Sequence, residues 1–185
     1  IKFVFAAAVD GTFYDPDDGG PAGDEKASGQ LQVIDVTSGS LPFQVASVSL
    51  PGVSGSCNDY CPGGRSIAYY DGKIYIGTHR VGGPEFHVFD VATDPTNPSH
   101  LGSTGSTQVE HNINDIKVRG TRAYLATSSD TEEAIVLDVS VPVAINIIGS
   151  FDAKKGDGST SGKDGRALSV SGDRIYLGIG RAVSG

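Results

Sequence analysis

The feature that most constrains this chain is a sequence unit that occurs three times at similar spacing. It reads IAYYDGKIYIGT at 67–78, IKVRGTRAYLAT at 116–127 and LSVSGDRIYLGI at 168–179. Each copy has an alternating apolar run, a turn with glycine and a second run that carries an aromatic residue. The tyrosines at the matching position, Tyr75, Tyr124 and Tyr176, lie 49 and 52 residues apart. A period of this kind indicates a repeat architecture, in which each unit packs against its neighbours.

A second signature accompanies the first: LQVIDVTS at 31–38, FHVFDVAT at 86–93 and AIVLDVSV at 134–141. Its aspartates, Asp35, Asp90 and Asp138, each stand just before a turn rich in Ser and Thr. We interpret them as acceptors for amides of that turn and not as catalytic acids, because an Asp in this position commonly bonds its own backbone.

Tight turns such as TDPTNPS and short apolar runs such as INIIGSF complete a unit of four short strands in about 48 residues. Four antiparallel strands per unit predict an all-β chain built as a β-propeller, in which each unit is one blade. Strands are expected at about 2–8, 31–36, 42–49, 66–70, 73–79, 86–91, 99–103, 113–118, 122–128, 134–139, 145–150, 166–170 and 174–179. We expect a partial blade at 1–49, full blades at 65–103 and 112–150, and a partial blade at 166–180.

The combined pattern resembles the LVIVD-repeat β-propeller proteins of bacterial and archaeal envelopes and secretions. The resemblance covers nearly the whole chain except three loops. It implies a fold, and because a fold does not define an activity, it leaves the function open. The strands group as three, four, four and two, about half of what a ring of six to eight blades needs. We therefore expect further blades in sequence outside this chain, with a ring of two copies as the alternative.

Composition narrows the class of protein. The chain has 185 residues, with 14 Lys and Arg against 22 Asp and Glu, and a net charge of -8. This balance argues against nucleic acid or a basic membrane-surface patch as the main partner. No apolar run approaches the roughly 18 residues of a membrane span. The sequence contains no Met, so Ile1 is not expected to be the translation start.

Three long connections are expected at one end of the sheets, at about 9–30, 50–64 and 151–165. In a propeller this end surrounds the mouth of the central channel, and long loops in a compact domain often carry function. The first connection holds Asp15, Asp17 and Asp18, which could bind one calcium ion. A solvated acidic loop is the preferred interpretation, so we expect no cofactor, with calcium as the alternative.

The second long connection holds the only cysteines, Cys57 and Cys61. They have neither the partner cysteines of a zinc site nor the histidine of a haem attachment motif. We expect a local disulfide and an extracytoplasmic location, in the periplasm, at the cell surface or secreted. A reduced, structurally inert pair is the alternative.

Polar residues at the expected starts of the inner strands are the remaining candidates. Arg65 and Arg166 occupy matching positions of the repeat and could together hold a carboxylate, a phosphate or an acidic partner. The preferred interpretation is that they satisfy loop carbonyls or the carboxylates Asp115 and Asp164. His111 and Asp115 lie at the same end of the middle unit.

These observations favour a non-enzymatic interaction module, one subunit of an exported or envelope-associated assembly, that binds a protein partner through the long loops. The first alternative is an enzyme of hydrolase type at the channel mouth, either with or without a dependence on calcium. The second is carbohydrate binding through Tyr14, Tyr60 or Tyr69.

Overall fold

A computed structural model describes residues 2–7, 30–37, 41–53, 63–80, 82–105, 108–154, 158–159 and 162–181. The described residues form thirteen strands in four antiparallel sheets, together with the short 3₁₀ helix η1 (Pro142–Ala144). The first sheet contains β1 (Phe3–Ala7), β2 (Leu31–Asp35) and β3 (Phe43–Val48), and the second contains β4 (Gly64–Tyr70), β5 (Lys73–Thr78), β6 (Phe86–Asp90) and β7 (Ser99–Ser103). The third contains β8 (Ile113–Arg119), β9 (Arg122–Thr127), β10 (Ala134–Asp138) and β11 (Asn146–Phe151), and the fourth contains β12 (Lys163–Ser171) and β13 (Arg174–Arg181).

The all-β class is therefore confirmed, and the strands lie close to the expected ranges. In each sheet, sequential strands are hydrogen-bonded neighbours, as short connections require. The arrangement of these sheets as blades of a propeller stays a prediction.

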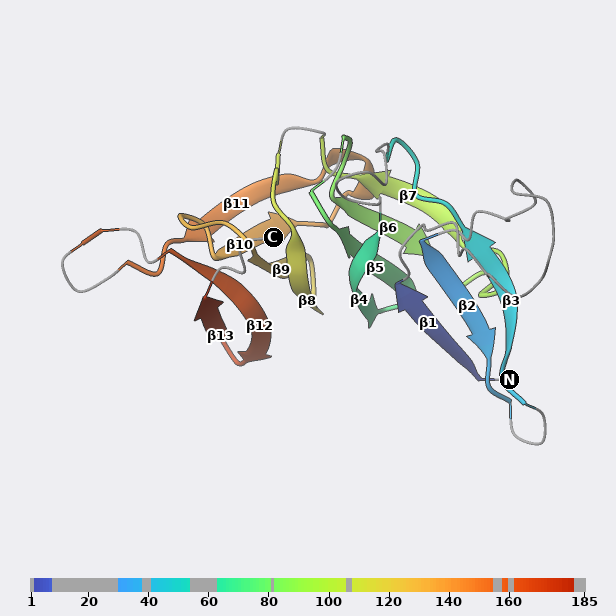
Figure 1. Cartoon of the computed structure of the whole chain (residues 1–185). Coiled ribbons are helices and arrows are strands. Elements are labelled where there is room, and N and C mark those ends of the chain that lie inside the picture. Colours follow the sequence, from blue (N-terminus) through green and yellow to red (C-terminus); the bar gives the residue numbers. More distant parts are fainter. Residues whose placement is uncertain are drawn as a thin grey trace, which may run out of the picture.

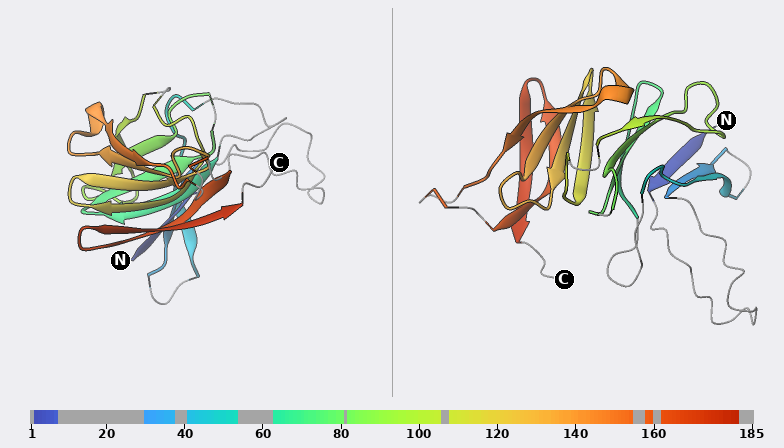
Figure 2. Two further views of the ribbon diagram at one scale, coloured as in Figure 1. Left: turned by 90° about the vertical axis from the view of Figure 1, so that its left-hand side faces the viewer. Right: turned by 90° about the horizontal axis from the view of Figure 1, so that it is seen from above.

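The sheets follow one another across the molecule in chain order (Figure 1). The first strand of each sheet contacts the first strand of the next: β1 contacts β4, β4 contacts β8, and β8 contacts β12. Seen from above, the sheets stand as successive layers (Figure 2). The central two sheets therefore have a neighbour on each face.

Burial on both faces explains the apolar runs of the second sheet. Alternate side chains of a strand point to opposite faces, so a strand with two buried faces needs apolar residues at consecutive positions. One face packs against the first sheet, in a cluster of Leu31, Leu50, Ile74, Ile76, Phe89 and Val91. The other packs against the third sheet, in a larger cluster that includes Tyr75, Phe86, Val88, Ile113, Leu125, Ile135 and Leu137.

The hairpins at one end of the sheets are tight, as the sequence predicts. Asp71 and Gly72 both have positive φ, 48° and 72°, which is the conformation of a two-residue hairpin turn that follows the twist of the strands. Gly120 and Gly172 each have a φ of 60° in the corresponding turns. We call this the turn end.

The role expected for the repeated aspartates is confirmed. Each accepts the backbone amide of the residue two positions later, at 2.7 Å for Asp35, 2.7 Å for Asp90 and 2.9 Å for Asp138. These carboxylates therefore hold turns together.

The opposite end, which we call the loop end, contains the starts of β4, β8 and β12. Ala7 and Gln30, which flank residues 8–29, both lie beside the start of β4. A Cβ placed on Gly64 would stand 2.9 Å from the Gln30 carbonyl and 3.0 Å from the Ala7 Cβ. The glycine therefore permits β4 to approach the first sheet closely.

The fourth sheet has two strands, and the outer edge of β13 pairs with no other described strand. Beside it lies an apolar groove of about 540 Å³, lined by Ala134, Phe151, Ala153, Lys154, Ile175, Leu177 and Ile179. None of the helical structure in the described residues has the length and hydropathy needed to cross a membrane.

Candidate functional site

The candidate site is a row of three side chains from three sheets at the loop end. In β4, β8 and β12 the pairing register shifts at the same place, so that Arg65, Asn114 and Arg166 are each the extra residue of a β-bulge. A bulge frees a residue from the ladder and redirects its side chain, and bulges are frequent beside functional sites. We call Arg65, Asn114 and Arg166 the bulge row.

Hydrogen bonds join the bulge row from strand to strand. Asn114 accepts from Arg65 Nε at 2.7 Å and donates through Nδ2 to the Gly165 carbonyl at 2.6 Å. Ser66 also donates to the Ile113 carbonyl at 2.9 Å, next to this link. The starts of β4, β8 and β12 are therefore tied together at the row.

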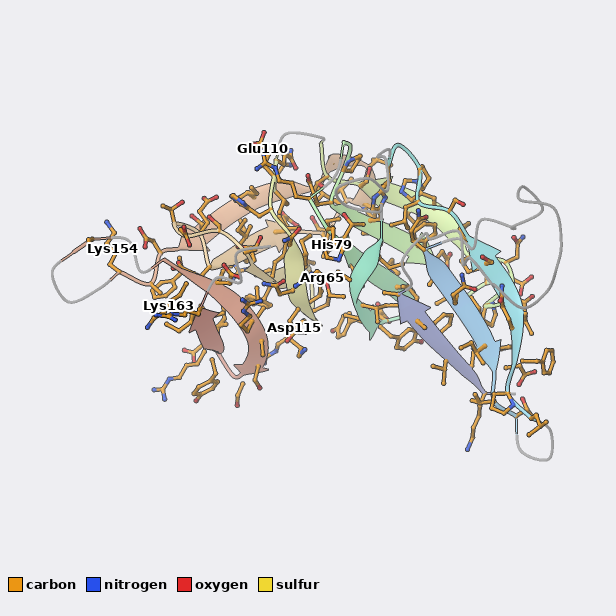
Figure 3. The ribbon with its side chains drawn as sticks, viewed as in Figure 1. Arg65, His79, Glu110, Asp115, Lys154 and Lys163 are labelled. Carbon is orange, nitrogen blue, oxygen red and sulfur yellow. The ribbon has the colours of Figure 1, made fainter. Side chains whose placement is uncertain are left out.

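His79, which follows β5, provides the second contact of Arg65. Arg65 Nη1 lies 3.3 Å from both ring nitrogens of His79, and the two side chains lie next to each other between β4 and β8 (Figure 3). Burial, and next the charge of Arg65, lower the pKa of His79. The imidazole is therefore neutral at pH 7 and can accept from the guanidinium.

Arg166 is paired differently. Its Nη2 lies 2.8 Å from Asp164 Oδ2 and also donates to the Arg181 carbonyl. Burial raises the pKa of Asp164 although Arg166 opposes that shift. Arg166 therefore satisfies a loop-end carboxylate, as the preferred interpretation of the sequence anticipated, whereas Arg65 bonds to neutral groups.

The two arginines also affect each other electrostatically. Burial, and next the positive charge of Arg166, lower the pKa of the Arg65 guanidinium, while Asp164 acts in the opposite direction. Asn114 bonds both to Arg65 and to the Gly165 carbonyl directly before Arg166, so the two arginines flank one side chain at the loop end.

Asp115, next to Asn114, is used within the fold. Its Oδ2 accepts the Leu168 amide of β12 at 2.7 Å, and its Oδ1 accepts from Lys117 Nζ at 2.6 Å. It does not contact the arginines through any described hydrogen bond. Asp115 therefore joins β8 to β12 just inside the bulge row.

His111 stands before β8 in the connection from the second sheet to the third. Burial lowers its pKa, opposed by the negative charge of Glu132, and Arg80, Glu110 and Asp130 also act on it. The next residue, Asn112, accepts the Arg80 amide at 2.7 Å, which ties this connection to the second sheet. His111 lies at the loop end, outside the direct contacts of the bulge row.

Of the other sequence candidates, Tyr69 is exposed on β4 and stacks on Phe5 with the ring centroids 6.2 Å apart. The remaining candidates lie outside the described residues: Asp15, Asp17, Asp18, Cys57, Cys61, Tyr14 and Tyr60. In the part of the chain that is described, no three His, Cys, Asp or Glu side chains are grouped so that they could hold a metal ion.

A further set of buried residues escaped the sequence analysis. Gln30, Glu85 and Glu133 each stand five residues before the turn aspartate of their sheet and are almost fully buried. Each accepts a backbone amide from the connection to the next sheet, which is Leu50 for Gln30, Glu110 for Glu85 and Ala153 for Glu133. Their fixed offset from the aspartate was the available signal. These residues attach the connections of the loop end to the sheets.

Two buried side chains have strongly shifted pKa values: Glu85, directly before β6, and His87, within β6. Burial raises the pKa of Glu85 to about 7, and its Oε2 has no hydrogen-bond partner among the described residues. Burial lowers the pKa of His87 to about 4, while its Nε2 lies 3.0 Å from the Pro84 carbonyl. Both are therefore sensitive to pH near neutrality or in mild acid.

Comparison with known protein families finds no family model that matches this chain, and comparison with curated proteins finds no match. The chemistry of the site therefore rests on its geometry. What the bulge row offers is a pair of guanidinium groups with fixed surroundings, which suits recognition of an anion.

Proposed function

We propose that the chain is part of a β-propeller of the LVIVD-repeat type and that it serves as a protein-interaction module of an exported assembly. Four successive antiparallel sheets with their inner strands in contact support the propeller. The extracytoplasmic location rests on the two cysteines and on the resemblance of the repeat.

The observation that carries the interaction role is the bulge row itself. Three residues from three sheets gather at the end where the long connections leave, and hydrogen bonds fix them there. Side chains that are held in place before binding lose less entropy when a partner docks. The loop end is therefore the surface through which we propose that a protein partner binds.

In this proposal the acidic connection between β1 and β2, residues 8–29, belongs to the same surface. Ala7 and Gln30, at its two boundaries, lie against Gly64, the residue before Arg65. A partner that contacts Arg65 would therefore meet residues close to this segment. Because residues 14–25 lie outside the repeat units of the sequence, removing them should leave the sheets intact.

The experiment is capture of partners from the envelope and secreted fractions of the source organism. Four immobilised forms are compared: the wild-type chain, the deletion of residues 14–25, the variant Arg65→Met and the control Arg174→Met at the turn end. We expect the same protein to be retained by wild type and Arg174→Met and to be depleted with the other two. Circular dichroism checks that all four are folded.

Retention that is unchanged by both loop-end changes and reduced by Arg174→Met would show that the turn end is the interaction surface. That result would contradict the proposal. The absence of any partner retained by the folded wild-type chain would also contradict it.

A further inference from the structure

We propose that Arg65 and Arg166 bind one carboxylate of an acidic segment of the protein partner. This inference rests on the proposed interaction role and names the chemistry of the group that is recognised.

The first step concerns the charge of Arg65. Its hydrogen-bond partners are the amide oxygen of Asn114 and the neutral imidazole of His79. Among the described residues, no carboxylate oxygen lies within 4.0 Å of its guanidinium. Arg65 therefore presents a positive charge that the described part of the fold does not neutralise.

The second step concerns orientation. Arg65 Nε is held by Asn114, which is itself fixed by its bond to the Gly165 carbonyl, and Nη1 is held by His79. The described structure gives Nη2 no partner. A guanidinium that is fixed along one edge and open along another suits a carboxylate, which accepts from planar N–H donors with defined geometry.

The third step concerns the net charge. Arg65 and Arg166 carry two positive charges, and Asp164, paired with Arg166 at 2.8 Å, carries one negative charge. The three groups together leave a single positive charge. A singly charged carboxylate neutralises it, whereas a doubly charged phosphate would leave one uncompensated negative charge beside Asp164.

The chain as a whole has a net charge of -8, so long-range electrostatics does not favour an acidic partner. Recognition must then come from short-range contacts at the bulge row. This predicts weak binding of small acidic peptides that depends strongly on Arg65 and is weakened by salt.

The test uses two synthetic peptides, acetyl-Gly-Glu-Gly-Glu-Gly-amide and the same peptide with Gln in place of Glu. Binding to the full chain is measured by NMR titration at about 50 mM salt, where screening is modest. We expect the Glu peptide to bind about tenfold more tightly than the Gln peptide, since a charged hydrogen bond of this kind contributes roughly one decade of affinity.

Two variants of Arg65 separate charge from geometry. Arg65→Met keeps the apolar stem and should remove the preference for Glu, while Arg65→Lys keeps the charge and should retain only part of it. Arg174→Met removes the same charge at the turn end and should leave binding unchanged. The amide signals that shift should include those of Asn114 and Gly165.

Equal binding of the two peptides to the wild-type chain, or an equal effect of Arg65→Met and Arg174→Met, would overturn the inference. Tighter binding of inorganic phosphate than of the Glu peptide, lost in Arg65→Met, would also overturn it in favour of a phosphate site. If partner capture survives while the peptide preference is absent, the carboxylate inference fails and the interaction role stands.

Discussion

Glu85 and His87 flank Phe86, point into buried surroundings and respond to pH in opposite directions. Burial raises the pKa of Glu85 from 4.5 to about 7, so the folded state keeps a proton that the unfolded state releases above pH 4.5. Its contribution to stability is full below pH 4.5 and is lost as pH rises to about 7. Burial lowers the pKa of His87 from 6.5 to about 4, so its contribution is full above pH 6.5 and is lost as pH falls to about 4.

Each shift corresponds to about 3 kcal/mol across its own range, because one pKa unit equals about 1.4 kcal/mol. The two contributions offset one another between pH 4.5 and 6.5. We predict that, relative to wild type, Glu85→Gln makes stability rise more steeply with pH over this interval and that His87→Gln makes it rise less steeply or fall. Gln is chosen because Gln30 and Gln32 occupy the matching positions of the first sheet.

The measurement is urea denaturation of wild type and both variants at pH 4.5, 5.5 and 6.5. The lowered pKa values of His79 and His111 add the same rise with pH to all three profiles, so the expected result is a difference from wild type, steeper for Glu85→Gln and shallower for His87→Gln. Three parallel profiles would show that neither group titrates differently in the folded and unfolded states.

The strand β8 contacts β4 on one side and β12 on the other, and Asn114 supplies part of both connections. Replacing Asn114 with Ala removes the acceptor of Arg65 Nε and the donor to the Gly165 carbonyl. Gly165 is buried, so its carbonyl would lose a partner away from water. We predict a loss of roughly 1–3 kcal/mol in the free energy of unfolding, the usual effect of an unsatisfied buried polar group.

The matched control is Asn146→Ala. Asn146 is exposed and donates to the Ala144 carbonyl on the protein surface, so its removal should change stability by less than about 0.5 kcal/mol. Urea denaturation of both variants decides the matter. Equal losses in the two would mean that the link across β8 contributes nothing specific.

The sequence predicted the strands well but placed two strand starts too late. β12 begins at Lys163 and β4 at Gly64, whereas the expected ranges began at 166 and 66. The reason is that glycine before a strand resembles loop sequence. Gly165 is instead required inside the sheet, because a Cβ there would stand 2.0 Å from the Glu133 carbonyl. A contact of this kind between sheets cannot be deduced from one sequence.

Because contacts between sheets cannot be deduced from one sequence, only part of the candidate site could be predicted. The equivalence of Arg65 and Arg166 was visible because both precede the same repeat strand. Asn114 at the third position was overlooked as their link, since its role depends on a bulge in each strand. Glu85 and Glu133 share an offset from the repeat aspartate, but a buried acid that holds a loop amide has no distinct residue pattern.

At the scale of the whole molecule, the proposed export depends on residues that the described structure does not include. We predict that Cys57 and Cys61 are joined by a disulfide in the mature protein. Such a bond, in the connection before β4, would stabilise the fold by limiting the conformations of the unfolded chain. Mass spectrometry after alkylation, with and without reductant, measures this. Labelling of both thiols in native, unreduced protein would contradict the bond and weaken the case for an extracytoplasmic location.

The second sheet is covered on both faces, whereas the fourth sheet packs against one neighbour. We therefore expect different parts of the molecule to unfold at different free energies. Amide protons of β5 and β6 lie between two apolar clusters, so their exchange with solvent should require global unfolding. Those of β13 pair with β12 along one edge and with no described strand along the other, and Ile175, Leu177 and Ile179 of this strand line the apolar groove. Native-state hydrogen exchange should therefore show a gradient, with the β12–β13 hairpin detaching first while the centre remains closed.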